Sequence, residues 1–353
     1  MTLLVVVAFY KVEAVLILGK LRLCILVLIG LSYPALAAKS YHIEQMDANE
    51  AYSHGALLRA QFKSSEARQY LKYAADKGNA DAAYVYALDT LGYRHNERVS
   101  EQAQFYIEKA AEGQSLFALN YIYQFGDWIS KAKRDSYQRQ YHDRLIELGA
   151  DAPDRALLLL SNYFHQSDLS LSQYYLDKAR SFELPQAQMM YAARLEQGEG
   201  DFFFDSDRIA AMSNSYLKAA QAGYIPAIKK YITLLEEQGK LDKAFQWRQK
   251  AREQGDVTSL VTLAKIYSGQ SQRYDFVNQD LIKAKVYFEL YLETVGQDRL
   301  LQTYEKVEQD YKDIVDTLSE QDIAQADEMK AILSDQEKYY HHDYLWLDWH
   351  VKE

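Results

Sequence analysis

The side chains that could carry out chemistry are scattered along this chain and do not gather in a motif. Its 50 Asp and Glu residues fall at the spacing of a helical surface, which indicates solvated faces and not a general acid–base pair. The sequence contains no HExxH or CxxC motif, no GxSxG elbow, and no phosphate loop of the GxGxxG or GxxxxGK[ST] type. We therefore predict a protein that is not an enzyme and that uses no cofactor.

The densest histidine cluster lies near the C-terminus, in the stretch YYHHDYLWLDWHVKE. His341 and His342 are adjacent, and His350 follows nine positions after His341. Adjacent residues of a helix point about 100° apart, so this pair would chelate a metal poorly. We interpret these histidines as surface or capping residues and predict no metal site.

The bulk composition favours a large helical protein. The chain has 353 residues, of which 48% are hydrophobic and 25% are charged, so it can bury a sizeable core. Only 4 Pro and 15 Gly residues occur, which argues against many short strands joined by tight turns. The net charge of −10, without an evident basic patch, disfavours nucleic acid as a partner.

The first 37 residues have the features of a secretory signal peptide. Lys20 and Arg22 precede the apolar run LCILVLIGL, and SYPALAA follows with a small-residue cleavage site that ends at Ala37. The stretch upstream of this unit is either an extended positive region or the product of a start codon chosen too early. An uncleaved anchor over residues 3–31 is the alternative, and it would be the protein's only connection to a membrane.

Cleavage near Ala37 would remove Cys24, which is the only cysteine. The mature chain would then contain no disulfide and no thiolate metal ligand, and packing alone would hold it together. These features predict a periplasmic or secreted protein of a Gram-negative bacterium.

A sequence pattern recurs about every 36 residues, which is the spacing of a structural repeat. Two intervals are longer, near DFFFDSD and SGQSQRYDF, and we predict loop insertions there. Equivalent marker positions are Gly78, Gly113, Gly149, Glu183, Gly223, Gly255 and Gly296.

An amphipathic segment with small residues precedes each marker. In the first copy Ala67, Tyr70, Leu71, Ala74 and Ala75 are three or four positions apart, which places them on one helical stripe. The small side chains let a neighbouring helix approach, and the glycine ends the helix in a left-handed C-cap. The structural residues predicted in this way are Ala74, Ala75, Gly78, Ala110, Ala111, Gly113, Ala219, Ala220, Gly223, Ala251 and Gly255.

A second segment with its own pattern of small and bulky residues follows each marker, as in Ala82, Tyr86 and Ala87. Two helices per unit cannot each close a private core, so they bury their faces on their neighbours. We predict an all-α fold, an α-solenoid of about six to seven helix hairpins over residues 38–299. Residues 300–353 would form C-terminal capping helices and an aromatic tail.

The stretches KYAADKGNADAAYVYA and LKAAQAGYIPAIKKYI resemble the Sel1-like repeat, a relative of the tetratricopeptide repeat. The likeness covers about residues 64–270, with degenerate copies on either side. The resemblance implies a binding scaffold, with roles such as envelope assembly, adaptors of secretion or motility complexes, and periplasmic regulators of sensor kinases.

Some of the 30 tyrosines lie outside the repeat pattern and are candidates for a binding surface. Tyr84, Tyr121 and Tyr123 either pack in the core or line an inner face, where aromatic rings could contact a peptide or a sugar. The tail residues Tyr340, Trp346 and Trp349 either cover the last repeat or dock on a partner.

These observations predict an exported, non-enzymatic scaffold that binds a protein, either a peptide or a component of an envelope complex. The alternative is a glycan-handling solenoid of an exopolysaccharide synthesis or export system, with polysaccharide as its partner.

Overall fold

The computed structural model describes residues 42–91, 99–298, 300–336 and 338–342. The chain divides into two compact units, residues 1–46 and residues 47–353. The first unit contributes one short 3₁₀-helix, η1 (His42–Gln45), and the repeats lie in the second. The predicted signal peptide, Trp346, Trp349 and His350 lie outside the described residues.

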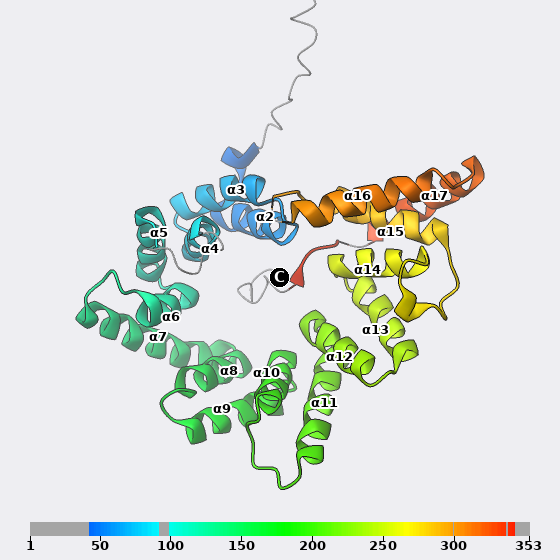
Figure 1. Ribbon diagram of the computed structural model, residues 1–353. Coiled ribbons are helices and arrows are strands. Elements are labelled where there is room, and N and C mark those ends of the chain that lie inside the picture. Colours follow the sequence, from blue (N-terminus) through cyan, green and yellow to red (C-terminus); the bar gives the residue numbers. More distant parts are fainter. Residues whose placement is uncertain (1–41, 92–98, 299, 337, 343–353) are drawn as a thin grey trace, which may run out of the picture. The chain divides into compact units, whose positions relative to one another are not determined.

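The second unit contains 16 α-helices within the described residues, and Figure 1 shows them following one another along the chain. The helices are α2 (Ala48–Ala60), α3 (Ser64–Asp76), α4 (Ala80–Leu91), α5 (Glu101–Glu112), α6 (Leu116–Phe125), α7 (Lys131–Asp151), α8 (Pro153–Phe164), α9 (Leu169–Ser181), α10 (Pro185–Glu196), α11 (Asp205–Gln221), α12 (Ile225–Glu237), α13 (Leu241–Glu253), α14 (Val257–Tyr267), α15 (Leu281–Thr294), α16 (Leu301–Val315) and α17 (Glu320–Gln336).

Each helix from α2 to α15 packs against the next one in the chain, so that they form seven successive hairpins. Helices α16 and α17 then both pack against α15. The described residues contain no strand, and a single isolated bridge joins Asp256 and Tyr340. The predicted all-α fold of about six to seven hairpins is confirmed.

The alanine stripes form the contacts between neighbouring helices. Ala74 and Ala75 of α3 and Ala110 and Ala111 of α5 are fully buried, with no exposed surface. Their small side chains leave room for larger neighbours, and the rings of Tyr86 and Tyr106 meet edge to face at 4.7 Å. Alanine also has the highest intrinsic helix propensity, so one residue type favours both the helix and its close packing.

The positions with a left-handed backbone differ in part from those predicted. Gly78 has φ of 100°, as expected for a glycine that ends α3. Gly113 instead has φ of −76°, and the left-handed position is that of the next residue, Gln114, with φ of 64°. Gly113 is needed for space, because a Cβ atom there would lie 2.7 Å from Cβ of Ala80.

Two further markers are not C-caps at all. Gly149 lies inside α7, which continues to Asp151. Gly296 is not in the left-handed region, and a Cβ atom there would lie 2.6 Å from the carbonyl oxygen of Phe62. Its requirement for glycine therefore comes from the close approach of another part of the backbone.

The two long intervals of the repeat are loops, as predicted. Residues 197–204 join α10 to α11, and residues 268–280 join α14 to α15 and include the 3₁₀-helix η2 (Gln272–Tyr274). In both cases the flanking helices keep the hairpin packing of the other repeats.

Residues 338–342, here called the C-terminal segment, connect the first hairpin to the α13–α14 corner. The backbone N–H of Tyr340 donates to the carbonyl of Gly255 at 3.0 Å, and the N–H of His341 donates to the carbonyl of Ala60 at 2.9 Å. The amide of Gln61 donates to the carbonyl of Tyr339 at 3.0 Å. The first and last hairpins of the array are therefore fastened to one another through this segment.

Candidate functional site

A cleft of about 450 Å³ opens between α4, α6, α7 and α8. Its lining includes the apolar side chains of Leu116, Phe117, Leu148 and Leu159, together with several side-chain amides and charged groups. Concave sites that combine an apolar wall with a few oriented polar groups are typical of ligand and peptide binding.

Polar side chains in the cleft lining are held in place by hydrogen bonds between neighbouring repeats. Asn79 accepts from the backbone N–H of Ala82 at 2.7 Å, and its side-chain N–H donates to Asn49 at 2.9 Å. The hydroxyl of Ser115, at the start of α6, donates to Asp81 of α4 at 2.5 Å. These polar groups are therefore pre-positioned at the turns where helices begin.

The charged groups lining the cleft are Arg144, Arg155 and Asp81. Arg144 forms an ion pair with Glu147 one turn away, and its side chain is partly exposed. Its Nε is buried and has no hydrogen-bond partner among the described residues. The charged side chains of the lining are thus two arginines and one aspartate, in a protein of net charge −10.

Four rings, here called the aromatic row, extend from the cleft along α4 and α6. Tyr84 stacks on Phe117 at a centroid distance of 6.2 Å and meets Tyr121 edge-on at 6.0 Å, and Tyr121 contacts Phe125 at 5.3 Å. Phe117 also lines the cleft, so the two surfaces are continuous. The side chain of Phe125 is 59% exposed, which gives the row an accessible end.

The predicted binding tyrosines occupy different depths of this surface. Tyr84 is only 6% exposed, so it forms the wall beneath Tyr121 and is not itself a surface residue. Burial raises the pKa of the Tyr84 phenol, and the hydroxyl stays protonated at neutral pH. Tyr121 and Tyr123 are half-buried. Tyr123 packs instead against Tyr141, with ring centroids 5.7 Å apart.

Tyr340 lies away from the cleft, in the C-terminal segment. It pairs with the backbone of Gly255 and Val257, and its ring stacks on that of His342 at 4.1 Å. The ring of His341 contacts Phe62 at 5.3 Å. The structure therefore gives Tyr340 contacts that join the ends of the array and does not bring it together with Tyr84, Tyr121 and Tyr123.

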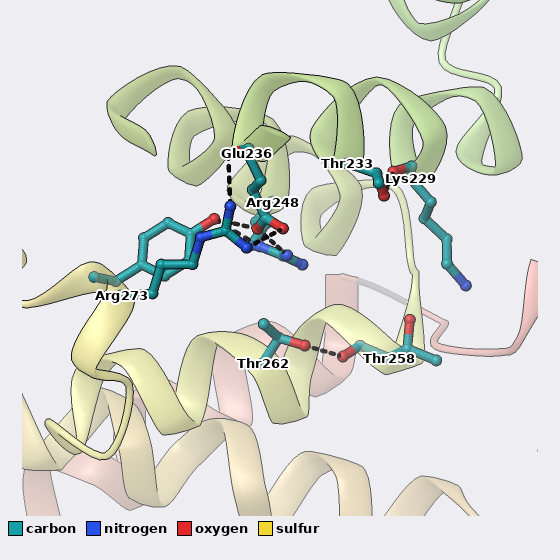
Figure 2. Close-up of polar contacts among 8 residues, drawn as sticks. Lys229, Thr233, Glu236, Arg248, Thr258, Thr262 and Arg273 are labelled. Carbon is teal, nitrogen blue, oxygen red and sulfur yellow. Dashed lines mark hydrogen bonds and ion pairs between the residues drawn. The ribbon is translucent and has the colours of Figure 1, made fainter. Parts of the chain in front are cut away.

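A polar cluster that the sequence analysis missed joins α12, α13 and the α14–α15 loop (Figure 2). Glu236 pairs with Arg248, accepts a hydrogen bond from Tyr274, and lies 3.6 Å from Arg273. The guanidinium of Arg273 also donates to the backbone carbonyl of Glu236 at 2.6 Å. We call Glu236, Arg248, Arg273 and Tyr274 the Glu236 cluster.

The electrostatics of the Glu236 cluster point to a structural role. Burial alone would raise the pKa of Glu236, but the hydrogen bond from Tyr274 and the pairing with Arg248 outweigh it and lower the pKa. The carboxylate is therefore ionised and fully engaged. Nearby, the hydroxyl of Thr233 in α12 donates to the backbone carbonyl of Lys229. In the same way the hydroxyl of Thr262 in α14 donates to the carbonyl of Thr258, one turn earlier in its own helix (Figure 2). This arrangement fastens a loop to the array and provides no general acid or base.

Two kinds of site are absent from the part of the chain that the structure describes. No group of three or more His, Cys, Asp or Glu side chains there could hold a metal ion. Among the same residues, no helix combines the length and the apolar character that crossing a bilayer requires. The cleft and its aromatic row combine an apolar lining with oriented polar groups, and this geometry suits binding.

The fold defines a class of protein, an all-α solenoid whose neighbouring helices pack through buried stripes of small residues. No protein-family model matches the chain, and no curated protein matches it.

Solved structures of low similarity do match. A Sel1 repeat protein from Oxalobacter formigenes is 19% identical, with 77% of this chain and 80% of that chain covered and a TM-score of 0.36. A protective antigen of uropathogenic Escherichia coli that displays an SLR fold is 15% identical, with 84% and 78% covered and a TM-score of 0.27. An immunity protein from Pseudomonas aeruginosa is 18% identical, with 63% and 84% covered and a TM-score of 0.38.

Proposed function

We propose that the protein is a non-enzymatic binding scaffold that holds a segment of a partner protein in the cleft and along the aromatic row. The observation that carries this proposal is the continuity of the two surfaces through Phe117, from an amide-lined cleft to the exposed ring of Phe125. Tyr and Arg side chains of this kind are the usual anchors of protein interfaces.

The chemistry of the cleft selects the type of segment. An aliphatic or aromatic side chain of the partner would pack against Leu148 and Leu159, and the amide side chains of Asn79 and Asn120 are within the same lining to pair with main-chain groups. Because the lining contains two arginines and one aspartate, a segment with a carboxylate near its apolar anchor complements it best.

The protein is proposed to act in the bacterial envelope, after export and cleavage near Ala37. The support is the signal-like sequence of residues 1–37 and the absence of cysteine from the remaining chain. Detection of the processed chain in a periplasmic or culture fraction, with an N-terminus close to residue 38, is the expected result. A full-length chain in the cytosolic fraction would contradict this assignment.

The alternative partner is a polysaccharide, and the packing of the aromatic row disfavours it. A sugar-binding surface presents several open ring faces, whereas Tyr84, Phe117 and Tyr121 pack on one another and leave Phe125 as the strongly exposed ring of the row. The experiment below nevertheless distinguishes the two partners.

Affinity capture from an envelope extract tests the proposal, followed by measurement of binding to the purified captured molecule. The variant Phe125→Ala alters the aromatic row, and Arg144→Gln alters the cleft. Phe105→Ala on α5 is the matched control, because the Phe105 side chain is 61% exposed and belongs neither to the cleft nor to the aromatic row. Loss of one anchor costs about 2 kcal/mol, so we expect binding about 30-fold weaker for the two site variants. Recovery of polysaccharide without protein would overturn the proposal, as would equal affinity of all three variants.

A further inference from the structure

The loop between α10 and α11 carries the most exposed aromatic side chain of the described residues. Phe203 is 91% exposed and Phe204 is 59% exposed, and their rings meet edge to face at 4.7 Å. Figure 1 shows this loop as a projection from the helices that it joins. Two adjacent phenylalanines so placed remain in water unless another molecule covers them, and such patches mark interaction sites.

The loop is anchored, so the two rings are presented in a defined position. Phe202 packs against the core formed by Leu195, Met212 and Tyr216. Arg208 donates to the backbone carbonyl of Leu195 and to Asp205, which ties the start of α11 to the end of α10. The base of the loop is therefore fixed while the two outer rings have no part in the core.

A second cleft adjoins the loop. Its volume is about 740 Å³, and its lining mixes apolar and polar groups that include Asp201 and Phe202 of the loop and Leu169 and Gln173 of α9. Leu169 is 63% exposed. The two exposed rings project from the surface, and the second cleft lies next to the loop that carries them. A folded partner can enclose a projection of this kind.

The charges around the rings define the partner. Residues 199–208 read EGDFFFDSDR, with four carboxylates and one arginine, so the segment has a net charge of −4 + 1 = −3. This charge repels anionic phospholipid headgroups. It equally opposes pairing of the loop with the same loop of a second copy, because like charges would face each other.

We propose that Phe203 and Phe204 insert into an apolar pocket on a partner protein and that Lys and Arg side chains border this pocket. The rings supply the buried anchors, and the carboxylates supply orientation and a fast, salt-dependent encounter. This interaction uses a surface separate from the cleft of α4, α6, α7 and α8, so the protein would hold two different partners at once.

The test begins with a photo-reactive phenylalanine analogue at position 203 in the full chain, expressed in its own bacterium. The cross-linked protein is identified and purified, and its affinity is measured for the parent and for three variants. The double variant Phe203→Ser/Phe204→Ser removes the two exposed rings, and Asp201→Asn/Asp207→Asn removes two negative charges. Phe105→Ser on α5 is the matched control. All these positions are on the surface or in the loop, and circular dichroism verifies that each variant is folded.

We expect the phenylalanine double variant to bind at least about 30-fold more weakly and the aspartate double variant to lose most of the salt dependence, with the control unchanged. Phe125→Ala should leave this affinity unchanged, so failure of the proposed cleft function is distinguishable from failure here. Four results would each overturn the proposal. The first two are that no protein is cross-linked and that the cross-link forms only to a second copy of this chain. The third is that the parent and all variants bind with equal affinity. The fourth is that the parent binds phosphatidylethanolamine–phosphatidylglycerol vesicles and the phenylalanine double variant does not.

Discussion

Replacing Tyr339 by alanine should loosen the connection between the first and last hairpins. Tyr339 is 3% exposed in the core that also contains Phe62 of the first hairpin, and its backbone carbonyl accepts from Gln61. Truncating a buried aromatic side chain to alanine costs about 3–5 kcal/mol, because apolar contact is lost and a cavity remains. The hydrogen bond from Arg252 to the Tyr339 hydroxyl is long, at 3.3 Å, so Tyr339→Phe should cost only about 1.5 kcal/mol.

Hydrogen–deuterium exchange at neutral pH is the suitable assay, because an array of repeats does not have to unfold in one step. In Tyr339→Ala the protected amides of α2 and of the first turn of α14 should exchange faster, since the C-terminal segment bonds to Ala60 and Val257. The amides of α8 should be unaffected. Tyr174→Ala, at a side chain that is 55% exposed, is the control and should change stability by less than about 0.5 kcal/mol.

Two results would refute this reasoning. If Tyr339→Ala and Tyr174→Ala had equal stability, Tyr339 would not be a core residue. If exchange increased in α14 alone and α2 stayed protected, the first hairpin would be stable without the C-terminal segment, and that segment would not be what stabilises the first hairpin.

Three other perturbations test the packing of the repeats. Ala110→Leu should lower the stability by about 1–3 kcal/mol, because Ala110 has no exposed surface and a larger side chain overpacks the contact; an unchanged melting temperature would contradict this. Gly78→Ala should cost about 1 kcal/mol of backbone strain, whereas Gly255→Ala should cost more, because its Cβ would also lie 2.4 Å from the carbonyl oxygen of Lys338; equal losses in thermal unfolding would show that the second contact is absent. The pKa of Glu236 is lower in the folded protein than its ordinary value of 4.5, so its contribution to stability is present above that pH and is lost as the pH falls below it. Glu236→Gln should therefore be less stable than the parent at pH 7 and converge with it in acid, and parallel stability–pH curves would refute the pairing.

The helices and their buried stripes could be predicted from the sequence because their signal is local and repeated. Ala74, Ala75, Ala110 and Ala111 recur at helical offsets, and each copy reinforces the interpretation of the others. The positions of the two insertion loops could be predicted for the same reason. A repeat interval longer than the others shows where extra residues are inserted, although it does not show their conformation.

The exact cap residue could not be predicted, because a tertiary contact decides it. In the second copy α5 ends so that Gly113 lies against Ala80 and the left-handed position passes to Gln114. In the third copy α7 continues through Gly149. A shift of one or a few residues at a helix end leaves no trace in the periodic pattern.

The candidate site also lies beyond local patterns. The cleft takes its lining from five helices, α2, α4, α6, α7 and α8, and from the turns between helices, and Arg144 and Arg155 come from two of these helices. The partners of Glu236 are Arg248 of the next helix and Arg273 in a loop 37 positions away. Such groups are brought together only by the hairpin packing, so the sequence can suggest individual tyrosines but not the surface.

Exchange of backbone amides in the complex with the captured partner tests most directly whether the protein works by binding through the cleft. Binding in the cleft predicts slower exchange in α6 (Leu116–Phe125) and α8 (Pro153–Phe164), which line the cleft, and no such change with the Arg144→Gln variant. Protection confined to other helices, or a captured molecule that leaves α6 and α8 unchanged, would contradict the account.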